Sequence, residues 1–187
     1  MDKSIQIQVL RSSRKTIAMR ITGPNAVEIR APRTMSQAQI DGFIQQHQAW
    51  LDKHMGIVNQ REQEIAQLPP LTEMEIRALA EQALAKIPAR VRYFAGLLHV
   101  TYGRITIRNQ KSKWGSCSSQ GNLNFNCLLM LCPPEVLDYV VVHELCHRRE
   151  MNHSPRFWAE VEHIDPDYKA HRQWLKDEGG KLIARMK

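Results

Sequence analysis

The chain has 187 residues, 43% of them hydrophobic and 24% charged, with a formal net charge of +7. This length and apolar content suffice for one domain, or for a small domain attached to a larger one. No segment has the apolar length of a membrane span, and residues 1–4 begin no apolar signal region, so we expect a soluble cytoplasmic protein without a membrane partner. The four cysteines form no C-x-x-C pair, and we predict that they are free thiols.

Positive charge is unevenly distributed along the sequence. Residues 1–35 hold seven Lys or Arg and two acidic residues, a net charge of +5, which we interpret as the solvated faces of strands. A second cluster has no acidic residues and comprises Arg104, Arg108, Lys111 and Lys113. Such clusters indicate that a nucleotide or a nucleic acid is an alternative partner of the protein.

The N-terminal third shows the pattern of strands followed by a helix. Apolar residues alternate with polar ones over residues 5–9 and 17–21, which predicts a β-hairpin, and residues 27–30 add a third short strand. Ser36 and Gln39 are spaced as a capping box at the start of a long helix that runs into residues 59–67. A small N-terminal sheet and a long helix are therefore expected.

Leu68-Pro69-Pro70 is the strongest break in the chain, and we place the boundary between two parts, residues 1–68 and 69–187, at this point. Thr72 and Glu75 form a second capping-box pattern. The helix that they start has apolar residues on one face and ends near Gly96, with a kink or a restart at Pro88.

Two strands are predicted downstream of this helix, at residues 105–107 and 122–126. We expect them to form a hairpin whose tip is the polar loop of residues 111–119, which contains Trp114. This hairpin leads directly to the segment that carries the chemistry, and we predict that it forms one wall of a cleft.

That segment begins at Pro133-Pro134, which suits a helix start, and contains His143-Glu144-Leu145-Cys146-His147. Residues four apart on a helix lie one turn above each other, so His143 and His147 can present two imidazole nitrogens to one point. Catalytic zinc takes such nitrogens at about 2.0–2.1 Å and keeps one position for water. Glu144 is placed to accept a proton from that water.

A third ligand follows the helix. His153 comes six residues after His147, and we favour it over Glu160 and Glu162, which lie on the next predicted helix. Asp165 or Asp167 is a candidate to orient a ligand histidine by accepting a hydrogen bond from its second ring N–H.

The motif Lys113-Trp114-Gly115-Ser116-Cys117, with the His143–His147 segment and residues 152–158, resembles the YgjP-like metallopeptidase family. This family of minimal zincins is related in arrangement to SprT-like and WLM domains, and the resemblance covers nearly the whole chain. It implies an α+β fold: a zincin-like catalytic domain over 69–187, in which an antiparallel sheet accompanies the HExxH helix, preceded by the small N-terminal sheet and long helix over 1–68.

By this resemblance His143, His147 and His153 bind Zn²⁺ and Glu144 is the general base. The six-residue step to His153 equals that of the metzincins, but Glu150 stands where they have a glycine. We therefore expect a longer helix and a turn at residues 151–152.

The function predicted is that of a zinc-dependent hydrolase, a metallopeptidase or protease that cleaves peptide bonds in a peptide or protein with a zinc-activated water. One alternative is a metal-dependent nucleotide pyrophosphatase that converts UTP to UMP and diphosphate, an activity also assigned to the family. A second alternative is a non-catalytic, zinc-stabilised module that binds nucleic acid or protein.

Substrate contacts are predicted from the same stretches. The strand of residues 122–126 is our candidate edge strand for an extended peptide, with Asn124 on it. Trp114 in the polar loop is a second contact. In the pyrophosphatase alternative, phosphates would be bound by the basic cluster of Arg104, Arg108, Lys111 and Lys113. The candidates for stabilising an oxyanion are His163, Tyr168, Asn124 and Trp114.

Overall fold

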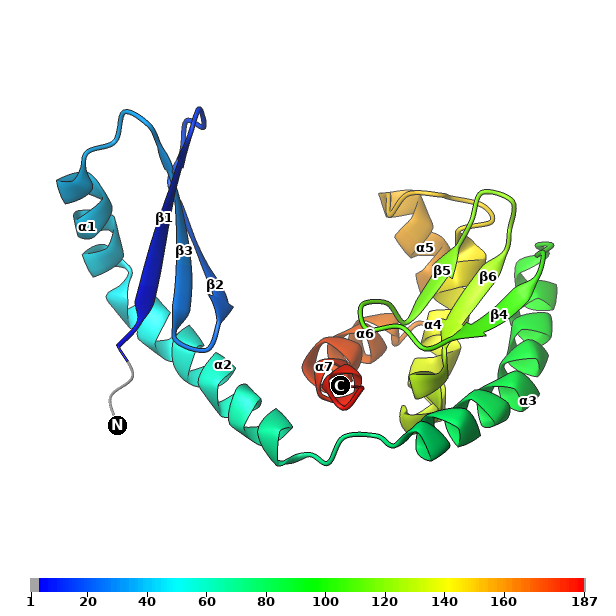
Figure 1. The fold of residues 1–187 in the computed structure, drawn as a ribbon. Helices are drawn as coiled ribbons and strands as arrows, with labels where there is room; N and C mark the ends of the chain where they lie inside the picture. The colour runs from blue at the N-terminus through cyan, green and yellow to red at the C-terminus, as the bar shows by residue number, and fades with distance from the viewer. Residues whose placement is uncertain (1–3, 187) are drawn as a thin grey trace. The chain divides into compact units, whose positions relative to one another are not determined.

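The computed structural model describes residues 4–186. Its contacts divide the chain into two compact units, with the boundary in the sequence between Leu68 and Pro69 (Figure 1). Among the described residues, no helix has the length and apolar character needed to cross a membrane.

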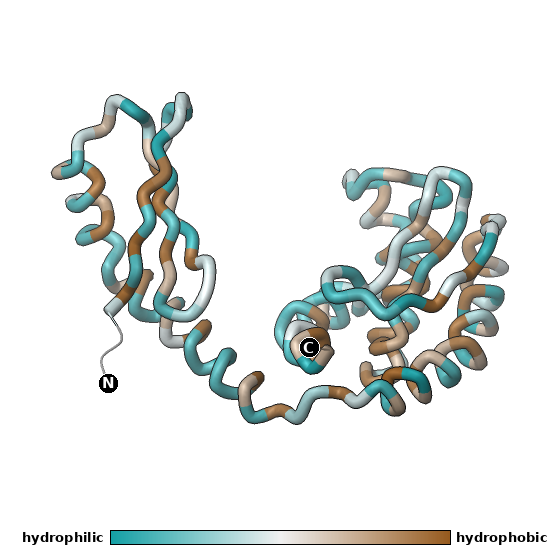
Figure 2. Tube along the Cα trace, viewed as in Figure 1, coloured by the Kyte–Doolittle hydropathy of each residue, from teal (hydrophilic) through white to brown (hydrophobic). Residues whose placement is uncertain are grey.

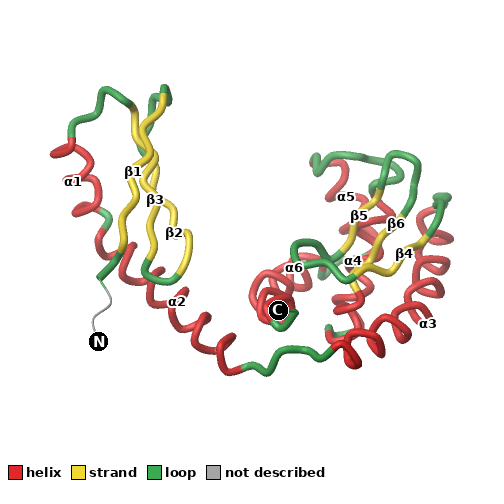
Figure 3. Tube along the Cα trace, viewed as in Figure 1, coloured by secondary structure: helices red, strands yellow, loops and turns green. Residues whose placement is uncertain are grey.

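The first unit is a three-stranded sheet with two helices (Figure 3). Its elements are β1 (Gln6–Ser12), β2 (Ala18–Gly23), β3 (Ala26–Pro32), α1 (Gln37–Gln46) and α2 (Gln48–Gln67). The strand order is β1-β3-β2, with β1 parallel and β2 antiparallel to β3. The predicted hairpin between residues 5–9 and 17–21 is therefore wrong, because β3 lies between those two strands.

Burial explains the central place of β3. Val27, Ile29 and Ala31 on this strand are at most 1% exposed, whereas most residues of β1 are exposed. A central strand has neighbours on both sides, so the strand with the most buried apolar residues takes that position. Figure 2 shows the apolar stretches along these strands and on the facing helices.

The capping box of Ser36 and Gln39 is present at the start of α1. The predicted single long helix is instead two helices, because the backbone of His47 leaves helical geometry with φ −105° and ψ 14°. Both helices contribute to the core under the sheet, α1 with Ile40 and α2 with Leu51 and Met55.

The second unit packs a mixed three-stranded sheet against helices (Figure 1). Its elements are α3 (Glu73–Leu98), β4 (Ile105–Arg108), β5 (Gly115–Cys117), β6 (Leu123–Asn126), the 3₁₀ helix η1 (Cys127–Leu131), α4 (Pro134–Cys146), α5 (Pro155–Ile164), α6 (Tyr168–Asp177) and α7 (Gly179–Ala184). The order is β4-β6-β5, with β4 parallel and β5 antiparallel to β6. The predicted α+β class is confirmed, and the parallel β4–β6 pair makes the sheet mixed.

Two predictions about this sheet are wrong. The polar loop of residues 111–119 contains β5, so the hairpin joins β5 to β6 and β4 pairs with β6 in parallel. The strand of residues 122–126 is central and has a partner on each side, so it is no edge strand. Leu123 and Phe125, both fully buried, account for the central place of β6.

The end of β6 fixes the loop that precedes β5. Asn126 is fully buried, and its amide donates hydrogen bonds to the carbonyls of Gln110 (2.7 Å) and Lys113 (3.0 Å). Its side-chain oxygen accepts from the backbone of Leu128 at 3.1 Å. All polar groups of this buried amide are thus paired, and its two donated hydrogen bonds hold Gln110 and Lys113 against the sheet.

Helix α3 starts at the predicted capping box of Thr72 and Glu75 and continues through Pro88 to Leu98. It is ended by His99, whose φ of 51° lies in the left-handed region. Helices α3 and α4 pack on each other, α3 beside β4 and α4 beside β5 (Figure 1). This packing brings α4 next to the loop that Asn126 fixes.

Candidate metal centre

Helix α4 carries the first two residues of the site on a rigid, buried element. Proline occupies its first turn, where the missing N–H costs nothing, and an apolar stretch that includes Val140, Val141 and Val142 is buried on it. The helix ends at Cys146, and His147 is its C-cap. The predicted longer helix before His153 is therefore wrong, and the chain turns immediately after the motif.

The three predicted histidines come together. His143, His147 and His153 each offer a ligand atom, and these atoms lie within 4.8 Å of one another. The Nε2 atoms of His143 and His153 are 3.0 Å apart. Nitrogens at tetrahedral positions around zinc, about 2.0–2.1 Å from the ion, lie about 3.3 Å apart, so this separation fits a shared ion.

The turn after α4 orients one of these rings. Nδ1–H of His147 donates to the carbonyl of Glu150 at 3.1 Å, which leaves Nε2 with its lone pair free. A carbonyl partner on the second nitrogen is the usual way in which proteins fix a ligand histidine. Glu150, which stands where the metzincins have a glycine, supplies this partner through its backbone carbonyl.

The aromatic side chains of α5 pack around the cluster. Ser154 caps this helix by accepting from the backbone of Phe157 at 3.3 Å. The Phe157 ring lies 4.9, 4.6 and 4.8 Å from the rings of His143, His147 and His153, centroid to centroid. The Phe157 ring therefore packs against all three histidines.

Electrostatics favour neutral imidazoles at the cluster. Burial, with the nearby His147 and His153, lowers the pKa of His143 to about 3. Burial also lowers the pKa of His147. Only neutral imidazole can bind a metal ion, so both rings are in the ligand-competent state at neutral pH.

Glu144 is almost fully enclosed, with 5% of its surface exposed. Burial raises the pKa of its carboxyl to about 8, and Lys113 acts in the opposite direction. The backbone of β5 lies directly against this carboxyl, since a Cβ added at Gly115 would come 2.6 Å from Glu144 Oε1. A glycine is needed at this position because of that approach.

Glu144, Gly115 and His143 line a pocket of about 250 Å³ between the β5 segment and α4. It is lined by Ser112, Lys113, Trp114, Gly115, Tyr139, Val140, His143, Glu144 and Leu175. Of the predicted substrate contacts, Lys113 and Trp114 therefore lie beside the catalytic candidate.

The other two predicted contacts lie elsewhere. Arg104 lines a separate pocket of about 440 Å³ formed by residues of α3 and β4. Asn124 is on the central strand, where its amide donates to Ser116 Oγ at 3.2 Å. Two features keep these residues away from the histidine cluster. One is the alternation of side chains along a strand, and the other is the order of the strands, which could not be read from the sequence.

The rival ligands have other partners. Glu160 pairs with Arg149, and Glu162 pairs with Lys169 at 3.1 Å. Asp165 does not orient a ligand histidine as predicted, because it accepts from His171 Nδ1 at 2.8 Å.

The candidates for an oxyanion donor are also dispersed. Tyr168 stacks on Trp158 with ring centroids 5.3 Å apart, and neither it nor His163 lines the pocket. Trp114 is the one candidate for this role that lines the pocket.

Asp167 is the second residue that was predicted to orient a ligand histidine. It is the N-cap residue of α6.

Sequence reasoning missed Tyr139 as a pocket residue. It lies one helical turn before His143, with ring centroids 5.8 Å apart, so the four-residue spacing was a usable signal. Burial raises the pKa of its hydroxyl to about 12. The hydroxyl therefore stays protonated at neutral pH and can donate a hydrogen bond.

Comparison with known proteins gives a family. The family model described as YgjP-like, metallopeptidase domain, matches residues 15–77 and 70–178. Similar solved structures are the metallopeptidase zymogens abylysin of Pyrococcus abyssi (23% identity, 48% of this chain and 93% of that chain, TM-score 0.44) and jannalysin of Methanocaldococcus jannaschii (24%, 49% and 96%, TM-score 0.41). No curated protein matches the sequence. The family match spans most of the chain on both sides of Leu68, and the protein belongs to the YgjP-like metallopeptidase family.

Proposed function

We propose that this protein is a zinc-dependent peptidase that cleaves peptide bonds in the pocket between β5 and α4. The observation that carries the proposal is that the nearly buried carboxyl of Glu144 and His143, one of three clustered histidines, line the same pocket. Burial raises the pKa of this carboxyl to about 8, so its ionised form is a stronger base than an exposed glutamate, as a group that accepts and returns a proton requires.

The donor set favours zinc over magnesium or calcium. Three imidazoles are ligands that suit zinc, whereas Mg²⁺ and Ca²⁺ prefer carboxylate and carbonyl oxygens. His143, His147 and His153 would hold the ion, with Glu150 orienting His147. When bound, zinc lowers the pKa of a water molecule toward about 7 and polarises the substrate carbonyl.

The protein's own groups supply the proton transfers. Glu144 would take the proton of the attacking water and pass it to the leaving amine nitrogen. Its enclosure by Gly115 and α4 keeps the carboxyl in one place and away from bulk water. Tyr139, which remains protonated, would donate a hydrogen bond to the oxyanion as charge develops there.

Strand β5 is the edge strand beside the pocket, so it replaces residues 122–126 as the candidate substrate strand. On its inner side, the backbone of Asn126 donates to the Trp114 carbonyl at 2.8 Å. The backbone of Ser118 donates to the Asn122 carbonyl at 2.9 Å.

Hydrogen-bonded and non-hydrogen-bonded residues alternate along an antiparallel strand. Since Trp114 and Ser118 point their backbone groups toward β6, those of Gly115 and Cys117 face the open side. An extended peptide could pair with these two residues and carry its scissile bond past His143 and Glu144.

The two alternatives have weaker support. No comparison supports a nucleotide pyrophosphatase, and Arg104 does not line the pocket, which leaves Lys113 as the cation there for a triphosphate. A structural zinc in a binding module would have four protein ligands, whereas the histidine cluster has three, next to a pocket.

The test compares Glu144→Gln with Glu160→Gln, which removes a carboxylate from the next helix. Zinc per chain should be about one in both variants and in the wild type. Casein hydrolysis should fall about 10²- to 10⁴-fold in Glu144→Gln alone, because only this variant removes the proton acceptor. His153→Ala should lose zinc and activity together.

Two results would contradict the peptidase. One is unchanged casein hydrolysis in Glu144→Gln with zinc retained. The other is UTP hydrolysis that depends on Glu144 in a protein that cleaves no peptide, which would select the pyrophosphatase.

A further inference from the structure

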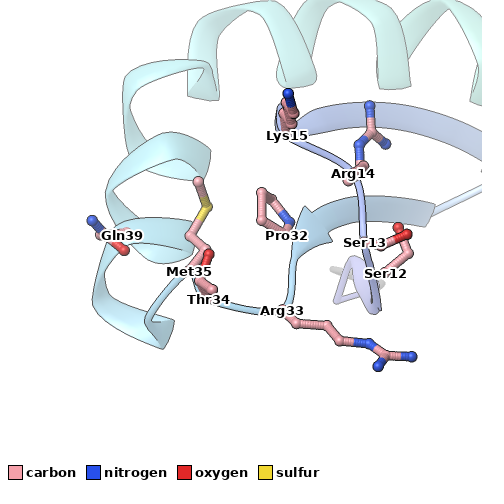
Figure 4. A pocket seen from close by; sticks show the side chains of 9 residues that line it. All are labelled: Ser12, Ser13, Arg14, Lys15, Pro32, Arg33, Thr34, Met35 and Gln39. Carbon is pink, nitrogen blue, oxygen red and sulfur yellow. The ribbon is translucent and has the colours of Figure 1, made fainter.

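The first unit contains a pocket of about 540 Å³ at one end of its sheet (Figure 4). The loop after β1 forms one side and the segment from Pro32 to Gln39 forms the other. The backbone of Arg33 donates to the Ser12 carbonyl at 3.0 Å, and the guanidinium of Arg11 donates to the Met35 carbonyl. These bonds tie the two sides together, so the pocket is built by the fold of this unit.

The polar side chains that line the pocket are cationic, hydroxyl-bearing or amide groups, and no carboxylate is among them. The cations are Arg14, Lys15 and Arg33, and the hydroxyls belong to Ser12, Ser13 and Thr34. Glu28 is the one carboxylate within residues 4–35, and it pairs with Arg30 at 2.7 Å. Within residues 4–186, the three cations have no ion-pair partner.

One of these cations lacks a partner at a buried atom. Arg14 Nε is buried and makes no hydrogen bond, while the far end of the same guanidinium is 3.4 Å from Thr16 Oγ1. Buried N–H groups are nearly always paired in folded proteins. The guanidinium of Arg14 would gain a partner for this group by turning toward an acceptor on a ligand bound in the pocket.

The directions of the cations identify the shape of the ligand. Figure 4 shows Arg14 and Lys15 side by side and pointing the same way, whereas Arg33 extends in the opposite direction. A cage for a single phosphate would have its cations converge on one point. Cations along opposite edges instead suit a ligand with many negative charges, such as a nucleic acid strand with one charge per about 3.4 Å.

We propose that this pocket binds the phosphodiester backbone of double-stranded nucleic acid without sequence preference. Cations and hydroxyls are the groups that proteins use to contact phosphate and sugar. No aromatic side chain lines the pocket, and proteins that bind single strands usually stack bases on such rings. This site is separate from the proposed peptidase centre and uses none of its residues.

The experiment measures binding of a fluorescein-labelled DNA duplex to the full chain by fluorescence anisotropy, between about 50 and 200 mM salt. In Arg14→Gln/Lys15→Gln, the Kd at low salt should rise about tenfold, and the slope of log K against log salt should shrink by about 1.8, which is 0.9 per lost phosphate contact. The matched control, Lys53→Gln/Lys86→Gln, removes the same charge from exposed positions on α2 and α3. Its Kd should stay within about twofold of the wild type.

Melting temperatures establish that each variant is folded. If Arg14→Gln/Lys15→Gln melts early, Lys15→Gln/Arg33→Gln tests the same pocket at two exposed side chains. The proposal is overturned if the wild type binds no duplex at low salt, or if the pocket variants bind no worse than the control. Equal competition by polyglutamate would overturn it in favour of an acidic protein partner.

Binding should be unchanged in Glu144→Gln and after removal of zinc by a chelator. A protein that binds DNA in this way and cleaves no peptide would refute the proposed peptidase alone. Loss of DNA binding after chelation would contradict the proposal that DNA binds at a site separate from the zinc centre.

Discussion

A close contact between backbone and side chain determines the geometry of the catalytic candidate. The carboxyl of Glu144 lies so near to Gly115 that an added Cβ would be 2.6, 2.8 and 2.9 Å from its Oε1, Cγ and Cδ atoms. Glu144 is buried and cannot retreat into solvent. Any larger residue at Gly115 must therefore move the carboxyl or the strand.

We predict that Gly115→Ala lowers kcat about 100-fold, because a displacement of about 1 Å in a catalytic group has effects of this size. Zinc content should be unchanged, since the three atoms nearest to the new methyl group all belong to Glu144, which is not a metal ligand. Steady-state kinetics with a peptide substrate and metal analysis measure both quantities.

The control for this variant is Gly96→Ala on α3, where an added Cβ meets nothing within 4 Å. It should keep full activity and gain slightly in stability, because alanine favours a helix. Wild-type kcat in Gly115→Ala would show that Glu144 is not held by this contact.

Single residues of the site could be predicted from the sequence where they are neighbours on one helix. His143, Glu144 and His147 follow from the helical repeat, and the same repeat would have given Tyr139. Gly115 could not be found in this way, because its contact with Glu144 joins residues 29 positions apart in the sequence. The placement of Arg104 outside the pocket likewise depended on the pairing of strands.

Strands could be located from the sequence, but their neighbours could not. In both sheets the strand that comes last in sequence, β3 or β6, lies between the other two. Alternation of apolar residues reports which face of a strand is buried and says nothing of its partners. β5 gave no periodic signal, because its three residues are Gly-Ser-Cys.

At the level of β5, the proposed role is to hold an extended substrate through the outward backbone groups of Cys117 and Gly115. Proline at an outward-facing position of an edge strand removes a donor without breaking the sheet. We predict that Cys117→Pro raises the KM for a peptide at least tenfold, the effect of losing about 1.4 kcal/mol of binding. Zinc content and melting temperature should be close to wild type.

Cys117→Ala is the matched control, because it removes the thiol and keeps the N–H. Its KM should equal that of the wild type. An unchanged KM in a folded Cys117→Pro protein would exclude pairing of the substrate with this position of β5.

The whole molecule consists of two units that each have a hydrophobic core of their own. The first is built around Val27, Ile29, Ile40 and Leu51. The Pro-Pro sequence after Leu68 indicated the boundary, since proline disfavours helix continuation. Contacts between residues far apart in the sequence of the second unit could not be predicted. The contacts of Pro69 and Leu71 with Arg185 are an example.

The beginning of the second unit is held by the end of the chain. The backbone of Leu71 donates to the Arg185 carbonyl at 2.8 Å, and Arg185 Nε donates to the Pro69 carbonyl at 3.0 Å. Leu71 itself is only 9% exposed. Residues 69–72 therefore belong to the second unit, although they precede its first helix.

We predict that a fragment of residues 69–187 folds on its own, binds one zinc and unfolds cooperatively, because its core needs nothing from the first unit. A fragment of residues 73–187 should melt at a lower temperature. It loses the buried Leu71 and the Thr72 cap, and a lost cap alone costs about 1 kcal/mol. Calorimetry and zinc analysis of the two fragments measure this difference. Equal melting temperatures would show that the contacts with Arg185 do not stabilise the unit, and failure of the longer fragment to fold would show that the unit depends on residues 1–68.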